Sequence, residues 1–283
     1  MEQLLAFGGE PEAVARLEKR TIPGPAGMLR VWVYTPACAP TGLLPGLLYF
    51  HGGGFVTGTL ENYDGVARCV TNASGCRLIA VDYRLAPEAP FPAAVLDACA
   101  VTRWAAENPE VLGIDAQALG VSGDSAGATL AAVVAQLLTA EGHTPLAIQC
   151  LICPILDYEV ETPSRTAFRS GYLLEPETLQ HDLRHYAAGI VKPEDPRISP
   201  LRAPRLEGLP PACIHTAEYD PLRDEAADYA ERMERAHVPV IYRCHPGMFH
   251  LFYGLKAVIP YTAMAYRSLG EDIRACFKFR KTR

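Results

Sequence analysis

The sequence predicts an α/β protein whose mostly parallel central sheet carries helices on both faces. Short apolar runs rich in β-branched residues alternate along the chain with longer runs of helical periodicity. Strands are expected at residues 29–34, 47–50, 78–83, 119–122, 148–153, 212–217 and 240–244. Helices are expected at residues 62–73, 93–107, 126–140, 221–236 and 255–276. Such alternation is typical of a parallel sheet, and ligands bind these sheets outside the carboxyl ends of the strands.

One segment interrupts this alternation. Residues 159–211 are polar and rich in proline, with a single predicted helix near residues 176–188. A long insertion between two strands of a compact sheet is often a lid or a binding element. We therefore expect one domain over residues 1–283, with a short amino-terminal segment at 1–28 and a cap-like insertion at 159–211.

The composition argues against several classes of partner. The chain has 26 Lys and Arg against 32 Asp and Glu, and it lacks the basic clusters that bind a nucleic-acid backbone or an anionic membrane. The longest apolar stretch, residues 126–140, is too short to span a membrane and contains Gln136. The amino terminus lacks a cationic region followed by an apolar one, so no secretory signal is visible. A cytoplasmic protein with no membrane span and no nucleic-acid partner is expected.

Two patterns could suggest metal or redox chemistry, and neither is favoured. The nine cysteines are odd in number and scattered, which indicates buried free thiols in a chain long enough to fold without disulfides. Cys150 and Cys153 form a C-x-x-C, but they lie in an apolar run typical of a buried strand. His181 and His185 have helical metal-site spacing without an accompanying glutamate or third ligand, so a solvated helix face is expected.

A candidate nucleophile follows the predicted strand 119–122. The motif Gly123-Asp-Ser125-Ala-Gly127 precedes a long alanine-rich helix. Glycines on both sides of the serine allow a tight strand-to-helix turn that lifts the hydroxyl above the sheet, although a purely structural turn is the alternative. A serine hydroxyl needs a histidine base oriented by a carboxylate, and in this kind of sheet the chain order is Ser, acid, His.

That order indicates Asp220 as the acid and His250 as the base. Asp220 lies in the turn after the strand 212–217, where Glu218 and Asp224 are competitors, and its structural alternative is a helix N-cap before Pro221. His250 lies beyond the last strand. The other histidines precede the acid in the chain, lie too close to a strand end or sit at the far end of a helix; they are His51, His143, His181, His185, His215, His237 and His245.

A glycine-rich loop follows the strand 47–50. In His51-Gly-Gly-Gly54, bare backbone N–H groups can point at an oxygen that becomes negative, and the N–H of Ala126 offers a second contribution. A dinucleotide site built on Gly52, Gly54, Gly58 and Asp82 is a rival interpretation, but its spacing is wrong.

Together these motifs resemble the hormone-sensitive-lipase-like esterases of the α/β-hydrolase superfamily. The resemblance rests on the HGGG motif, on 82–88 (DYRLAPE), on the GDSAG motif, on 218–225 (EYDPLRDE) and on 247–250 (GMFH). It implies Ser125 as nucleophile, His250 as base and Asp220 as its partner. It further implies Gly53, Gly54 and Ala126 as oxyanion donors, His51 as a residue that shapes the glycine loop, and 82–88 as architectural. Relatives often pair through the edge strand, here 240–244, so a homodimer is expected by resemblance.

The chain departs from the family pattern at two places. Only 50 residues precede His51, whereas the family's longer amino-terminal segment forms part of a cap, so the cap is expected to be reduced to the insertion 159–211. Leu251 follows the histidine where the family commonly has glycine, which is expected to reshape the pocket wall. Both departures affect the choice of substrate.

We therefore predict a serine carboxylesterase without metal or cofactor that hydrolyses small to medium acyl esters through an acyl-enzyme. The preference for small acyl groups rests on the short amino-terminal segment and on the lack of the long apolar lid of a true lipase. The alternatives are an amidase resembling arylacetamide deacetylases, and a non-catalytic small-molecule receptor on the same fold. The retention of both Ser125 and His250 weighs against the receptor.

Overall fold

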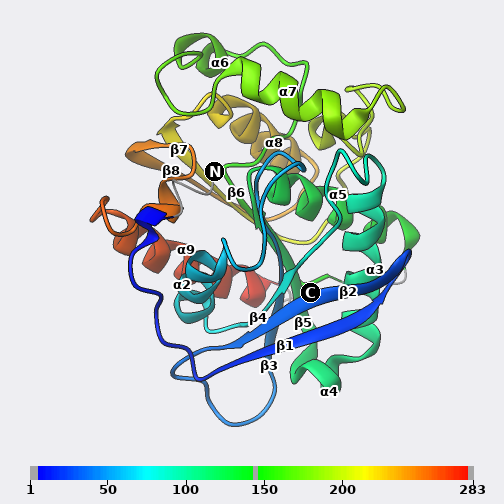
Figure 1. The fold of residues 1–283 in the computed structure, drawn as a ribbon, viewed down its shortest axis with the longest axis vertical. Helices are drawn as coiled ribbons and strands as arrows, with labels where there is room; N and C mark the ends of the chain where they lie inside the picture. Colours follow the sequence, from blue (N-terminus) through cyan, green and yellow to red (C-terminus); the bar gives the residue numbers. More distant parts are fainter. Residues whose placement is uncertain (1–5, 143–145, 280–283) are drawn as a thin grey trace.

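Eight strands form one twisted sheet in the computed structural model, which describes residues 6–142 and 146–279 (Figure 1). The spatial order is β1-β2-β4-β3-β5-β6-β7-β8, and the six strands from β4 to β8 in this order run parallel to one another. β2 pairs antiparallel with both β1 and β4. The strands are β1 (Arg16–Gly24), β2 (Gly27–Thr35), β3 (Leu44–Phe50), β4 (Arg77–Val81), β5 (Ile114–Asp124), β6 (Ile148–Ile152), β7 (Ala212–Tyr219) and β8 (Val240–Phe249). The predicted α/β class with a mostly parallel sheet is confirmed.

Helices cover both faces of this sheet. The α-helices are α2 (Asp64–Ser74), α3 (Ala93–Glu107), α4 (Pro109–Leu112), α5 (Ala126–Glu141), α6 (Pro163–Ala167), α7 (Pro176–Ala187), α8 (Arg223–Arg235) and α9 (Thr262–Phe279). Three short 3-10 turns are η1 (Ala6–Gly8), η2 (Pro200–Arg202) and η3 (Phe252–Gly254). Buried residues of α3, α5 and α8 pack on one face, whereas α2 and α9 pack on the other (Figure 1).

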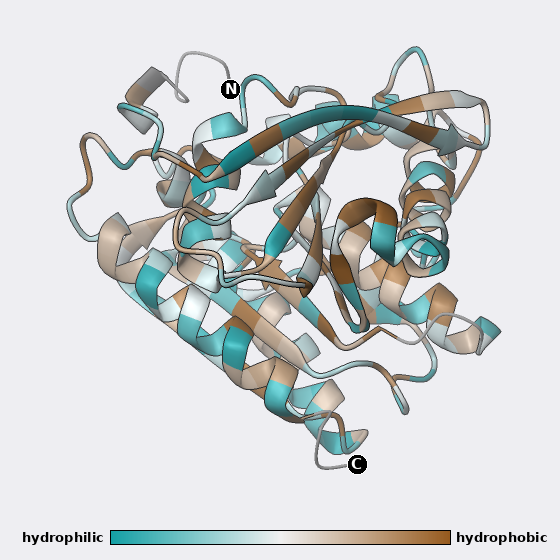
Figure 2. Ribbon diagram, turned by 90° about the horizontal axis from the view of Figure 1, so that it is seen from below, coloured by the Kyte–Doolittle hydropathy of each residue, from teal (hydrophilic) through white to brown (hydrophobic). Residues whose placement is uncertain are grey.

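Successive side chains of the central strands point alternately into the two apolar layers between the sheet and these helices. In β3, Leu48 and Phe50 belong to the layer under α5, and Leu47 and Tyr49 belong to the layer under α2 and α9. Because both faces are covered, the strands are apolar almost throughout, which explains why the sequence signal for them is so clear. Figure 2 shows hydrophobic colouring on the inner strands, while α9 alternates between hydrophilic and hydrophobic residues as expected of a helix with one exposed side.

The sequence pattern does not reveal β1. This strand lies at the edge of the sheet and forms a hairpin with β2 through the pairing of Gly24 with Gly27. Its residues are mostly polar and partly exposed, so no apolar run marks it. Three helices also begin later than predicted, and α2 does so by two residues, at Asp64. α8 begins at Arg223, after a turn at Asp220 and Pro221, and α9 begins at Thr262 because η3 and further turns occupy residues 252–261.

The insertion 159–211 lies over the carboxyl ends of the strands (Figure 1). It contains α6, α7 and η2. The guanidinium of Arg165 in α6 donates to buried Glu225 of α8 at 2.7 and 3.0 Å. The ring of Tyr186 in α7 stacks on Phe55, with 3.9 Å between ring centroids. These contacts place the insertion directly above the segment that follows β3.

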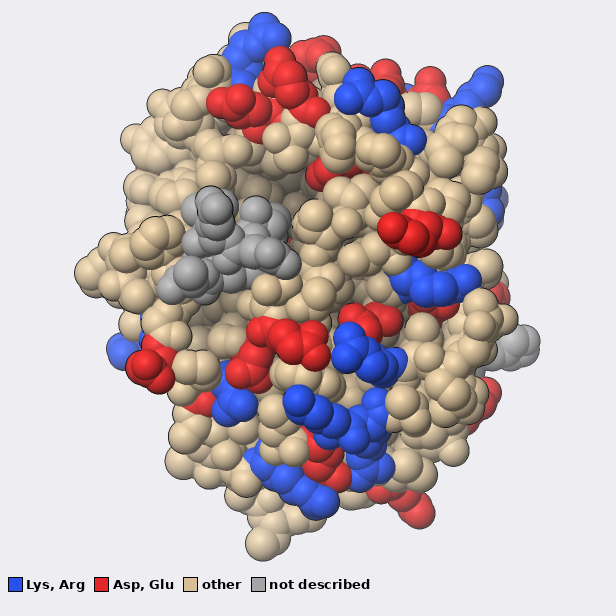
Figure 3. Space-filling view, in the orientation of Figure 1, with Lys and Arg blue, Asp and Glu red and all other residues tan. Residues whose placement is uncertain are grey.

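Charged side chains of both signs are interspersed over the face shown in Figure 3. Within the described residues, every helix falls short of the length and apolarity that crossing a bilayer requires.

The packing of α9 on α2 yields a test of this arrangement. A Cβ atom on Gly270 would overlap the backbone of Ala73, whereas a Cβ on Gly65 of α2 meets open space. We expect Gly270→Ala to lower the free energy of unfolding by about 2 kcal/mol or more, because the helices must separate to admit the methyl group. Gly65→Ala is the matched control and should change it by about 0.5 kcal/mol or less. Urea denaturation measures both, and equal effects would contradict the packing described.

Candidate active site

Ser125 occupies a strained turn between β5 and α5. Its backbone has φ 51° and ψ −121°, a combination that L-residues rarely adopt. The flanking glycines make this turn sterically allowed. A Cβ atom on Gly127 would overlap the carbonyl oxygen of Phe50 at the end of β3, and one on Gly123 would overlap the backbone of Gly127. The turn is therefore pressed against the neighbouring strand, and Ser125 lies at the top of the sheet.

The structure brings the three side chains of the predicted triad together. His250 Nε2 lies 3.0 Å from Ser125 Oγ, and His250 Nδ1 lies 2.8 Å from Asp220 Oδ2. All three residues are almost fully buried. Asp220 follows β7 and His250 follows β8, so two neighbouring strand ends supply the acid and the histidine. The second carboxylate oxygen of Asp220 accepts from the N–H of Leu222 at 2.9 Å, which fixes the plane of the carboxylate.

The two competing acids have other partners. Glu218 accepts from the N–H of Gly247 at 2.7 Å. Asp224 accepts from the N–H of Ser164 at 2.7 Å and from the guanidinium of Arg223 at 2.8 Å. Asp220 is therefore the carboxylate that the fold presents to the imidazole. Asp220 is not the helix N-cap that was its structural alternative, because α8 begins only at Arg223 with Leu222 at the N-cap. Its bond from the Leu222 N–H lies in the turn before the helix.

The imidazole of His250 is poised to accept a proton. Burial alone would lower its pKa, but the charge and hydrogen bond of Asp220 raise the pKa above its ordinary value. A carboxylate beside Nδ1 favours the tautomer with the proton on that nitrogen, which then donates to Asp220. Nε2 is left as an acceptor facing the hydroxyl of Ser125.

The glycine loop after β3 folds into a tight turn next to Ser125. Gly53 and Gly54 have φ values of 111° and 63°. The carbonyl of Gly53 accepts from the N–H groups of Val56 and Thr57 at 3.0 and 2.9 Å, so this peptide is held firmly. A Cβ on Gly53 would overlap Thr57, and one on Gly54 would overlap the carboxylate of Asp182. Bare backbone is therefore a steric requirement at both positions.

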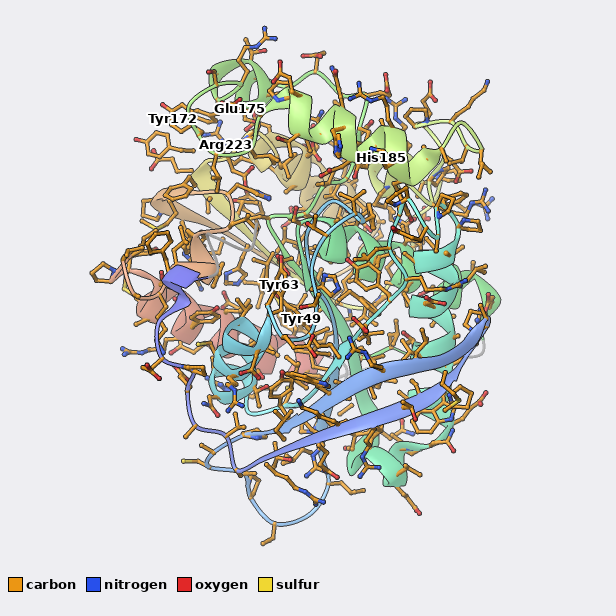
Figure 4. The ribbon with its side chains drawn as sticks, viewed as in Figure 1. Tyr49, Tyr63, Tyr172, Glu175, His185 and Arg223 are labelled. Atoms are coloured by element: carbon orange, nitrogen blue, oxygen red, sulfur yellow. The ribbon has the colours of Figure 1, made fainter. Side chains whose placement is uncertain are left out.

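Asp124 joins this loop to the nucleophile turn, a role that the sequence did not suggest. Its buried carboxylate accepts from Tyr49 Oη at 2.6 Å, from the N–H of Gly52 at 3.0 Å and from Tyr63 Oη at 3.3 Å. Figure 4 shows Tyr49 and Tyr63 close together. Burial raises the pKa of Asp124, although these hydrogen bonds oppose the rise. The sequence does show that Asp124 directly precedes Ser125. Which residues its carboxylate contacts depends on the order of the strands in the sheet, which the sequence pattern does not give.

His51 supports the loop from behind. Its ring stacks on Tyr83 with 4.4 Å between centroids, and its Nδ1 lies 2.8 Å from the carbonyl of Gly52. The Tyr83 hydroxyl donates to the carbonyl of His51 at 2.6 Å. Asp82 forms an ion pair with Arg30 at 2.8 Å, and Gly58 packs against the His51 ring. Of the residues in the rival dinucleotide interpretation, Gly58 therefore packs against the loop and Asp82 pairs with Arg30.

Other clusters that suggested metal binding have simpler explanations. The rings of His181 and His185 lie 4.6 Å apart on the exposed side of α7. Cys150 and Cys153 are buried free thiols, and burial raises the pKa of Cys153 well above its ordinary value. Among the described residues, Cys153, Asp220 and His250 offer three ligand atoms within 4.8 Å of one another. Asp220 and His250 are already hydrogen-bonded to each other, which accounts for their closeness without a metal ion.

Two cavities meet at Ser125. The first is walled mostly by apolar and aromatic side chains, among them Tyr49, Tyr63, Val66, Ile152, Cys153 and Tyr253. The second lies between the glycine loop and α7, and His250 lines it. Leu173 and Leu251 line both cavities, and both have left-handed backbones, with φ 74° and 65°. The left-handed conformation gives a physical reason for the glycine that the family commonly carries at the position of Leu251.

Comparison with known proteins places the chain in a family. A family model described as alpha/beta hydrolase fold matches residues 47–254. The chain belongs to this family. It is 39% identical over 247 residues to an esterase, LipI, of Mycobacterium tuberculosis, covering 87% of this chain and 77% of the relative. It is 38% identical over 252 residues to an ethyl acetate hydrolase of Pseudomonas putida, covering 88% and 79%.

Solved structures of this alpha/beta hydrolase family show the same architecture. A mutant of LAE6, an alpha/beta hydrolase enzyme from the metagenome of Lake Arreo, superposes with a TM-score of 0.94 at 40% identity, covering 98% of this chain and 88% of that one. The thermostable carboxylesterase EstE1 from a metagenomic library superposes with a TM-score of 0.90 at 37% identity, covering 98% and 94%. The predicted resemblance to hormone-sensitive-lipase-like esterases is confirmed.

The contact of Asp124 with the glycine loop can be tested through stability. Asp124→Ala leaves two buried hydroxyls and one N–H without their acceptor, and we expect it to lower the free energy of unfolding by about 2 to 4 kcal/mol. Asp124→Asn keeps an acceptor oxygen in the same place and should cost about 1 kcal/mol. Thermal and urea unfolding of both variants provide the comparison. Equal costs would show that the carboxylate does not hold the loop.

Proposed function

We propose that the protein is a serine carboxylesterase that hydrolyses small to medium acyl esters through an acyl-enzyme. The observation that carries this proposal is the continuous chain of hydrogen-bond distances from Ser125 Oγ to His250 Nε2, 3.0 Å, and from His250 Nδ1 to Asp220, 2.8 Å. A serine within reach of a neutral imidazole, itself oriented by a buried carboxylate, is an arrangement suited to acyl transfer.

In the proposed first half-reaction, Ser125 Oγ attacks the ester carbonyl while His250 Nε2 takes its proton. The new C–O bond pushes the carbonyl electron pair onto oxygen, and a tetrahedral intermediate forms. Asp220 stabilises the resulting imidazolium through Nδ1. The intermediate collapses, the bond to the alcohol oxygen breaks, and His250 returns its proton to the leaving alcohol.

Backbone N–H groups stabilise the negative oxygen of the intermediate in the proposed mechanism. We infer that the N–H groups of Gly53, Gly54 and Ala126 form this oxyanion hole. Gly53 and Gly54 lie in a turn held by Thr57 and Asp124, and Ala126 is the first residue of α5, whose amino end favours negative charge. Each such donor is worth about 3 kcal/mol in the transition state.

In the second half-reaction, water replaces the alcohol. His250 takes a proton from water, the oxygen attacks the acyl carbon, and collapse returns the proton to Ser125 as the carboxylic acid leaves. The proposed steps need no metal or cofactor, because the base, the acid and the oxyanion donors are all groups of the chain.

The two cavities at Ser125 support a substrate of limited size. Their walls include the insertion residue Leu173 and, in the second cavity, side chains of α7. We propose that residues 159–211 act as a reduced cap within a single domain, with the short segment 1–28 contributing mainly the hairpin strand β1. The similarity to an ethyl acetate hydrolase also favours small esters.

A homodimer and a cytoplasmic location remain proposals. β8 is the last strand of the sheet and pairs with β7 alone among the described strands, so its outer edge is the position for pairing with a second copy.

Hydrolysis of a p-nitrophenyl ester series tests the proposed function. We expect kcat/KM to be greatest between acetate and hexanoate and to fall for decanoate and longer chains, because the predicted cap is short and the chain lacks the long apolar lid of a true lipase. Ser125→Ala should lower kcat by roughly 10⁴-fold or more. The matching acetanilide should react far more slowly. Preference for long chains would overturn the size assignment, anilide hydrolysis at the ester rate would favour the amidase alternative, and an active Ser125→Ala would overturn the mechanism.

A further inference from the structure

Asp182 places a carboxylate in the wall of the second cavity. It lies in α7 of the insertion, and its side chain is only 14% exposed. The carboxylate packs so closely against Gly54 that any Cβ on that glycine would overlap it. Asp182 and Gly54 line the same cavity as Ser125 and His250. The acid therefore faces the proposed reaction centre from the cap side.

Among its described lining residues this cavity has no lysine or arginine that would hold a permanent positive charge beside the acid, and its histidines are His181 and His250. Within the described chain, the carboxylate contacts Nδ1 of His181 at 3.3 Å. That imidazole is 56% exposed, so its interaction is screened by water. His185 of α7 and Tyr158 of the preceding loop also face Asp182 at longer range.

An uncompensated carboxylate in this place conflicts with ester hydrolysis. The proposed oxyanion forms on the N–H of Gly54, next to Asp182, and two like charges at close range repel each other strongly where water is excluded. Burial also raises the pKa of Asp182, as expected of a carboxylate without a strong cationic partner. A cation seated in the cavity would remove both penalties.

We propose that Asp182 recognises esters that carry an ammonium group in the half that occupies the second cavity. This inference rests on the proposed ester hydrolysis and names its substrate class. The cationic group takes the place that a lysine or arginine would fill, and it neutralises Asp182 as the oxyanion develops. The ammonium can belong to the alcohol or to the acyl group, and the two sources are separable by experiment.

Two isosteric substrate pairs test the proposal. Acetylcholine and 3,3-dimethylbutyl acetate differ only by a quaternary nitrogen in the alcohol. The ethyl esters of 4-(trimethylammonio)butyrate and 5,5-dimethylhexanoate differ likewise in the acyl group. We expect wild-type kcat/KM to favour the charged member of at least one pair by roughly tenfold. Asp182→Asn should abolish this preference by slowing the charged member, and it should raise kcat/KM of the neutral member, because the repulsion between Asp182 and the oxyanion is removed.

Glu177→Gln provides the matched control, because Glu177 is an exposed acid on the same helix that lines neither cavity at Ser125. It should keep the preference. Equal kcat/KM within both pairs in the wild type, or a preference that survives in Asp182→Asn, would overturn the inference while leaving ester hydrolysis intact. If Asp182 only anchors α7, both members of each pair should fall together in Asp182→Asn. Failure of the folded wild type, checked by circular dichroism, to cleave any of the four esters would overturn the proposed function and this inference with it.

Discussion

The close contact between the nucleophile turn and the end of β3 governs the whole site. Gly127 lies so near the carbonyl of Phe50 that a side chain has no room, and Asp124 accepts a hydrogen bond from Gly52 across the same junction at 3.0 Å. These two contacts fix the hydroxyl of Ser125 relative to the backbone N–H groups of the glycine loop. If either contact loosened, the proposed attack and the proposed oxyanion hole would no longer share one geometry.

The topology supplies the remaining parts at one edge of the sheet. Parallel strands end together, so the segments after β3, β5, β7 and β8 converge even though Ser125 and His250 are 125 residues apart. The insertion packs over this edge through Arg165 and Tyr186, and Asp182 of the insertion lines the cavity at Ser125. In the proposed function the sheet supplies the reacting groups, and the insertion is proposed to select which esters fit.

The sequence reveals the parts of this design that local rules control. The glycine-serine turn, the chain order of acid and histidine, and the apolar strands each leave a direct pattern, and the predicted fold, family and ester-hydrolase class are confirmed. The polar edge strand β1 leaves none, because only one of its faces packs. The contacts of Asp124 depend on which strands are neighbours in the sheet, and those of Asp182 depend on where α7 packs. The spacing of residues along the sequence does not predict such tertiary contacts. The catalytic assignments of Ser125, Asp220 and His250 remain proposals.

The rate at which a fluorophosphonate modifies Ser125, followed by intact mass, tests the central claim that His250 activates this hydroxyl. We expect one adduct on Ser125 in the wild type, forming faster as pH rises through the pKa of His250, because only the neutral imidazole accepts the proton. His250→Ala should slow the reaction by roughly 10³-fold, whereas His185→Ala, which removes an exposed histidine of α7, should not change it. Equal rates in the wild type and His250→Ala, or an adduct on another residue, would contradict the account.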